Sequence, residues 1–192
     1  WHSGLVASGH AAPEIGLINV DAHLDVRPRK NGQHHSGSSF RLLLEEGIVR
    51  GRGFAEIGIQ SFAASEAHVD WLLSQGARLL TFEDATNAEL PNAFEECAFA
   101  VTNGDATMPL YLSIDMDSIR SSDAPGVSAP SPLRFLAEEA FELAVAAGLA
   151  GNVSAIDLVE LSPPYDLDGR TARLAARMIA GFLAGVANRK HR

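Results

Sequence analysis

Short apolar runs alternate with segments of helical periodicity along the whole chain, and this alternation restricts the possible folds more than any other feature. Residues 15–20 form a nearly all-apolar run, as expected of a strand buried on both faces. Further strands are predicted at residues 55–59, 79–82, 110–114 and 153–158, and helices at 38–49, 64–75, 88–101, 133–147 and 170–187. Strict alternation implies right-handed crossovers and a mainly parallel sheet with helices on both faces. The sequence therefore predicts an α/β three-layer sandwich.

Composition narrows the kind of protein that this fold can be. With 192 residues, 46% of them hydrophobic, the chain is expected to form a single domain spanning residues 1–192. The net charge of -9 argues against nucleic acid and anionic membranes as partners. No apolar run approaches the ~18 residues that a membrane span needs. Cys97 is the only cysteine, which excludes a disulfide framework and favours the cytoplasm.

Polar residues that can bind metals follow three of the predicted strands. Asp21, His23 and Asp25 occupy alternate positions after the first strand, and the pair Asp115 and Asp117 repeats this spacing further along. Glu160 follows the last strand. Because ligands bind outside the carboxyl ends of the strands in a parallel sheet, these groups are expected to converge on one crevice.

The donor set at this crevice predicts the type of metal. Four carboxylates and one imidazole suit a pair of octahedral Mn²⁺ ions, which carboxylates can bridge at a separation of roughly 3.5–4 Å. Without cations the same carboxylates would repel one another. Taken singly, an Asp after a strand is common in turns and helix caps. It is the occurrence of two such clusters in one α/β domain that favours a metal centre.

The residues of both clusters resemble the signatures of a known enzyme superfamily. The sequence Asp-Ala-His-Leu-Asp at residues 21–25 is similar to the Asp-Ala-His-x-Asp signature of ureohydrolases, the arginase and agmatinase superfamily. Ser-Ile-Asp-Met-Asp at residues 113–117 resembles their second signature, and residues 124–130 and 160–173 are similar to stretches of the formimidoylglutamase branch. The resemblance covers nearly the whole chain and implies an arginase/deacetylase-like fold.

The resemblance also implies a role for each site residue. Asp21 and Asp115 would bridge both Mn²⁺ ions, Asp25 would complete one ion, and His23 and Asp117 the other. A bridging hydroxide would be the nucleophile. Asp25 would also orient it and carry its proton as a catalytic residue. The other predicted catalytic and substrate-binding residues are Glu160, which would hold the cationic formimino group, Arg27, which would meet the amino-acid end of the substrate, and Ser36.

Three departures from the family pattern bear on the prediction. Residue 1 is Trp, and the Gly-Gly-Gly-His or Gly-Gly-Asp-His stretch that carries the family's first ligand is absent, so the chain is expected to lack its N-terminal strand or strands and this motif. His2 and His10 lack the glycine context and are not assigned in its place. Arg120-Ser121 stand where arginases and agmatinases usually carry Asp-Pro, and Ser36 stands where they have His. The last two departures favour the formimidoylglutamase branch.

The predicted function is manganese-dependent hydrolysis of N-formimino-L-glutamate to L-glutamate and formamide, a reaction of histidine degradation. The small-molecule substrate is the predicted partner, and the resemblance implies a homo-oligomer. Two alternatives stay open: an agmatinase or arginase activity at the same centre, and a catalytically silent, metal-binding remnant. A nucleotide-binding protein of this topology is disfavoured, because no Gly-rich phosphate loop follows any predicted strand.

Overall fold

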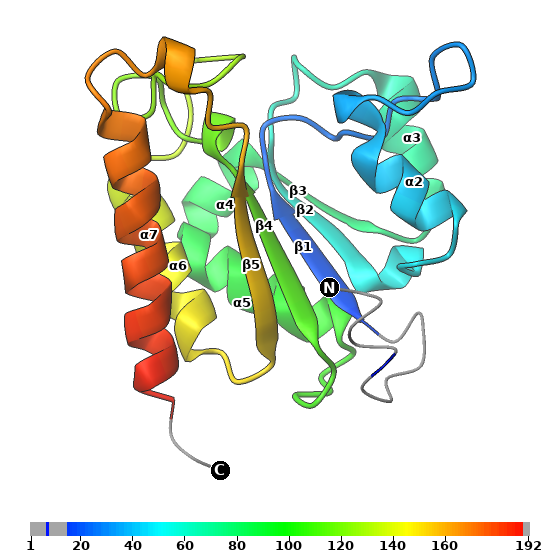
Figure 1. The fold of residues 1–192 in the computed structure, drawn as a ribbon. Coiled ribbons are helices and arrows are strands. Elements are labelled where there is room, and N and C mark those ends of the chain that lie inside the picture. Colours follow the sequence, from blue (N-terminus) through cyan, green and yellow to red (C-terminus); the bar gives the residue numbers. More distant parts are fainter. Residues whose placement is uncertain (1–6, 8–14, 190–192) are drawn as a thin grey trace.

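The computed structural model describes Ala7 and residues 15–189, and a five-stranded parallel sheet lies at its centre (Figure 1). In spatial order the strands are β3 (Arg78–Thr81), β2 (Phe54–Ile59), β1 (Gly16–Val20), β4 (Leu110–Asp115) and β5 (Val153–Val159). The chain moves outward from β1 to β2 and β3, and then adds β4 and β5 on the other side of β1. The sheet therefore has a topological switch point between β1 and β4, where a crevice is expected at the carboxyl ends.

Helices cover both faces of the sheet. α2 (Ser39–Glu45) and α3 (Glu66–Ser74) lie on one side, whereas α4 (Phe82–Ala88), α5 (Leu90–Val101), α6 (Ala137–Leu149) and α7 (Arg170–Ala187) lie on the other (Figure 1). Each side has its own hydrophobic core. In the core between the sheet and α4–α7, Phe94 and Cys97 of α5 and Met178 of α7 are fully buried. In the core between the sheet and the helices α2 and α3, Phe54 of β2 and Leu72 of α3 are buried. The predicted three-layer α/β architecture is confirmed.

Several element boundaries differ from the prediction for local reasons. The segment 79–101 was predicted as a strand and one helix, but it contains two helices, because Thr81 ends β3 and caps α4 by accepting a hydrogen bond from the backbone N–H of Asp84. α2 ends at Glu45, four residues before the predicted end, and Gly47 follows it in the left-handed region. α6 begins at Ala137 and not at residue 133, since Arg134 and Phe135 are buried in the preceding loop.

His2 and His10, which the sequence analysis left unassigned, lie outside the described residues. Among the described residues, no helix combines the length and the apolar character that a membrane crossing requires.

Candidate functional site

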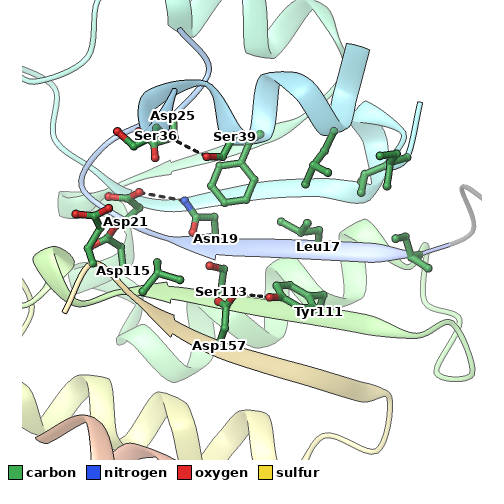
Figure 2. A pocket seen from close by; sticks show the side chains of 17 residues that line it. Leu17, Asn19, Asp21, Asp25, Ser36, Ser39, Tyr111, Ser113, Asp115 and Asp157 are labelled. Carbon is green, nitrogen blue, oxygen red and sulfur yellow. Dashed lines mark hydrogen bonds between the residues drawn. The ribbon is translucent and has the colours of Figure 1, made fainter. Parts of the chain in front are cut away.

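Three neighbouring strands deliver their terminal carboxylates to one edge of the sheet. Asp21 follows β1 directly, Asp115 is the last residue of β4, and Glu160 follows β5. The strands are in register, with Val20 beside Ile114 and Asp115 beside Val159. Figure 2 shows Asp21 and Asp115 close together at this edge. The convergence predicted from the strand ends is therefore present, and it lies at the switch point.

The same backbone turn follows both β1 and β4. Asp21 Oδ1 accepts a hydrogen bond from the backbone N–H of His23 at 2.8 Å, and Asp115 Oδ1 accepts one from the backbone N–H of Asp117 at 2.7 Å. An aspartate that binds the backbone two residues ahead folds the chain tightly and fixes its own carboxylate. This turn explains the spacing in the sequence, because it brings the side chain two positions later back beside the first aspartate.

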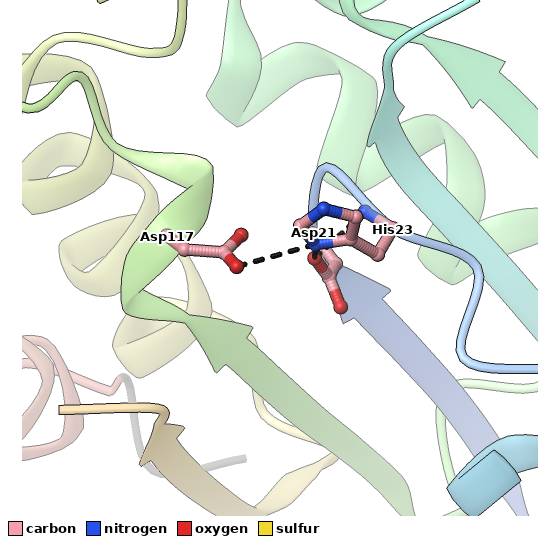
Figure 3. A group of neighbouring side chains, drawn as sticks. All are labelled: Asp21, His23 and Asp117. Carbon is pink, nitrogen blue, oxygen red and sulfur yellow. Dashed lines mark hydrogen bonds and ion pairs between the residues drawn. The ribbon is translucent and has the colours of Figure 1, made fainter. Parts of the chain in front are cut away.

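The two turns face each other across the switch point and form a compact ligand group. His23 Nδ1 lies 3.2 Å from Asp117 Oδ2 and 3.5 Å from Asp21 Oδ1. One ligand atom from each of the three residues lies within 4.8 Å of the others (Figure 3). Asp21 and Asp117 are buried, and His23 is partly exposed. Atoms so arranged can coordinate one ion together.

The protonation of these groups supports a cation at this position. Burial, followed by repulsion from Asp21, raises the pKa of Asp115 to about 9. Burial also raises the pKa of Asp21. The pKa of His23 is raised to about 10, mainly by its hydrogen bond to Asp117. Asp117 Oδ1 is buried without a hydrogen-bond partner among the described residues. A set of oxygen donors with one imidazole, short of positive charge, fits hard divalent ions such as Mn²⁺.

Two adjoining cavities open at this edge, and together they are lined by every residue that the sequence analysis assigned to the site. The larger, about 490 Å³, runs along the face of β1, β4 and β5, and the smaller is about 170 Å³. Both cavities are lined by Asp25, Ser36, Asp115 and Glu160. Asp21 lines the larger one, whereas His23, Arg27 and Asp117 line the smaller one.

Asp25 and Glu160 share an uncommon backbone conformation. Their φ angles are 46° and 61°, in the left-handed region that costs a residue with a side chain about 1 kcal/mol or more. Burial, followed by repulsion from Asp21, raises the pKa of Asp25 to about 7. Glu160 is oriented by Ser128, whose hydroxyl donates a hydrogen bond to Glu160 Oε2 at 3.0 Å. Strained residues of this kind cluster at functional sites.

The structure adds residues that the sequence analysis did not assign. Ser128 is one, and the buried Arg134 is another. Burial lowers the pKa of the Arg134 guanidinium, and the charges of Asp117 and Asp21 partly oppose this shift. Both lie in the irregular loop after β4. Ser128 falls within residues 124–130, which resemble the formimidoylglutamase branch, whereas Arg134 belongs to no motif. Gln60, which follows β2, donates a hydrogen bond from its side chain to the Leu133 carbonyl and lines neither cavity.

His34 and His35 do not line the two cavities either. His34 is exposed, and the ring of His35 lies 3.3 Å from the carbonyl oxygen of Pro28. Both belong to the loop that precedes α2.

Comparison with known proteins places this site in a family. A family model described as the arginase family matches residues 3–185. The chain belongs to the arginase family. This arginase-family chain is 35% identical over 179 residues to the formimidoylglutamase of Psychrobacter cryohalolentis, and the match covers 90% of this chain and 49% of that protein. It is 33% identical over 174 residues to the human mitochondrial guanidino acid hydrolase, with 90% of this chain and 48% of that protein covered.

A solved structure of the family confirms the predicted arginase-like fold. The crystal structure of Trypanosoma cruzi formiminoglutamase with Mn²⁺ matches with a TM-score of 0.87 and 34% identity, over 98% of this chain and 61% of that one. The arginase-family chain described here spans about half the length of the curated relatives that it matches. The likeness therefore extends across nearly all of this chain but only part of theirs.

Proposed function

We propose that the protein is a manganese-dependent hydrolase that converts N-formimino-L-glutamate to L-glutamate and formamide, a step of histidine degradation. The observation that carries the proposal is the convergence of Asp21, His23 and Asp117 within 4.8 Å at the switch point of the sheet. The kinship with proteins named formimidoylglutamase supports the choice of substrate. In the reaction, water adds oxygen to the formimino carbon, the bond from that carbon to the glutamate nitrogen breaks, and this nitrogen takes up a proton.

Residues at the ends of β1 and β4 would hold the metal. The proposed ligands are Asp21, His23, Asp25, Asp115 and Asp117. Bound manganese supplies Lewis-acid activation of water and of the group under attack. The hydrogen bonds from the two backbone turns hold Asp21 and Asp115 in place through one oxygen each, at 2.8 and 2.7 Å. The ligands are therefore ordered by the fold itself.

Asp25 is the residue proposed to move the proton. It lines both cavities and is partly buried among the proposed ligands, and a carboxylate so placed can accept and donate a proton. Asp25 would accept a proton from water and pass one to the nitrogen of the departing glutamate.

Glu160 and Arg27 are proposed to hold the two ends of the substrate. Glu160, oriented by Ser128 at 3.0 Å, would accept charge-assisted hydrogen bonds from the cationic formimino group. Arg27 is exposed and lies over Gly37, where an added Cβ would stand 3.1 Å from Arg27 Cδ. Both line the smaller cavity with Ser36. A guanidinium here would pair with a substrate carboxylate, and the Ser36 hydroxyl would add a hydrogen bond.

The proposal is tested by counting bound manganese by elemental analysis and by assaying hydrolysis of N-formimino-L-glutamate, agmatine, arginine and a guanidino acid in parallel. Two Mn²⁺ per chain with preferred turnover of formiminoglutamate is the expected result. Preferred turnover of agmatine, arginine or a guanidino acid would retain the centre and overturn the substrate. No turnover would mean that the chain is a silent metal-binding remnant.

A matched pair of arginines tests the substrate contact. Arg27→Ala is expected to raise KM for formiminoglutamate about tenfold or more while leaving Mn²⁺ binding unchanged, because it removes a charge-assisted pair. Arg29→Ala is the control, since Arg29 is also exposed but lines neither cavity. Equal KM values for the two variants would remove Arg27 from the site.

Three further proposals rest on the family resemblance and the cysteine content alone. The chain is proposed to form one ureohydrolase domain, to assemble as a homo-oligomer and to work in the cytoplasm.

A further inference from the structure

A row of polar side chains crosses the sheet just below the proposed metal ligands. Glu56 on β2 is the register partner of Asn19 on β1, Asn19 is the partner of Ser113 on β4, and Ser113 is the partner of Asp157 on β5. Glu56, Asn19 and Ser113 are buried. Figure 2 shows Asn19, Ser113 and Asp157 in a row across the strands, beside Asp21 and Asp115. The proposed mechanism uses none of these residues.

Asn19 links this row to a metal ligand. Its side-chain nitrogen donates one hydrogen bond to Asp21 Oδ2 at 3.3 Å and another to Glu56 Oε2 at 3.0 Å. The other oxygen of Asp21, Oδ1, accepts the backbone N–H of His23. Asp21 is therefore held through both of its carboxylate oxygens. Glu56 has an acceptor oxygen whether or not it is protonated, so the link does not depend on its charge.

The burial of Glu56 costs stability that packing does not explain. Its side chain is fully buried, and Glu56 Oε1 has no hydrogen-bond partner among the described residues. Burying a carboxyl group with an unpaired oxygen is unfavourable, and an apolar side chain of similar volume is often more stable at such a position. A function for this residue is therefore the simpler explanation of its presence.

We infer that Asn19 and Glu56 form a positioning pair that fixes Asp21 in its metal-binding orientation, with Glu56 anchoring the Asn19 amide. The inference rests on the proposed metal site. Partners that orient a ligand without touching the metal typically contribute tenfold to a hundredfold to metal affinity. The pair acts through Asp21, and neither residue contacts substrate.

The test compares Mn²⁺ affinity, measured by isothermal titration calorimetry, in wild type, Glu56→Leu, Glu56→Gln, Asn19→Leu and the double Leu variant. Glu56→Leu is expected to weaken Mn²⁺ binding about tenfold or more while the melting temperature of the metal-free protein stays level or rises. Glu56→Gln, which keeps an acceptor for Asn19, should stay within about threefold of wild type. The double variant should bind no more weakly than either single one, because the pair acts as a unit.

Other outcomes would overturn the inference. Glu56→Leu with wild-type affinity would show that the pair does not position Asp21, and an equal loss in Glu56→Gln would show that charge and not geometry matters. A crystal structure of metal-free Glu56→Leu gives a readout that does not require metal binding. The Asp21 carboxylate should be rotated, and an unchanged orientation would refute the inference. If wild type binds no Mn²⁺, the proposed function fails. The crystal structure of metal-free Glu56→Leu then decides by itself whether Asn19 and Glu56 position Asp21.

Discussion

Binding of Mn²⁺ should release protons, because the proposed ligands hold them at neutral pH. His23, with a pKa of about 10, and Asp115, with a pKa of about 9, each carry nearly one proton at pH 7. Asp25, with a pKa of about 7, carries about half of one. Each must lose its proton to bind a cation, so filling the site is expected to release about two to three protons, shared among coupled groups.

The sign of the pH dependence follows directly. Protons compete with the metal, so affinity should rise with pH, by about a hundredfold per pH unit for two released protons. The rise should continue to about pH 10, where His23, the ligand with the higher pKa, loses its proton unaided. Calorimetric titrations at pH 7 in buffers of different ionisation enthalpy count the protons, and titrations between pH 6 and 8 give the slope. Release of fewer than about half a proton, together with a flat affinity, would refute the account of the site.

Three substitutions test separate parts of the structure. His23→Ala should weaken Mn²⁺ binding by more than the hundredfold typical of residues that only support a ligand. His35→Ala is the control, because His35 lies outside both cavities and its loss should leave Mn²⁺ binding unchanged. Equal calorimetric affinities of the two variants for Mn²⁺ would exclude His23 as a ligand. Ser128→Ala removes the hydrogen bond to Glu160 and should lower kcat/KM about fivefold, equivalent to about 1 kcal/mol, at unchanged Mn²⁺ affinity; an unaltered rate would remove its orienting role. Gly58→Ala should destabilise the protein by about 1–3 kcal/mol in urea denaturation, because φ is +100° and the new Cβ would stand 2.7 Å from a Phe135 ring carbon; wild-type stability would contradict this packing.

Much of the fold was accessible from the sequence because local and global signals agree. β1 is buried at all its positions, and its apolar run states this directly. The errors occurred where a capping residue decides the boundary, as at Thr81, or where tertiary contacts override periodicity, as at Arg134 and Phe135. A buried arginine in a loop cannot be recognised from a pattern, since its burial depends on segments distant in the chain.

The candidate site was predictable to the extent that strand ends carry it. Asp21 and His23 are two positions apart because they belong to one local turn, and turns can be predicted from sequence. The link between Asn19 and Glu56 could not be read, because these residues are 37 positions apart and meet only through the register of two strands. Support for the ligands is therefore visible only in the folded protein.

The central claim is that the turns after β1 and β4 together hold manganese. The most direct measurement is anomalous diffraction at the manganese edge from crystals of the protein grown with Mn²⁺. The account predicts a peak within coordination distance of His23 Nδ1, Asp21 and Asp117, the atoms that already converge within 4.8 Å. Crystals grown with Mn²⁺ that show no peak there, or a peak only elsewhere, would contradict it.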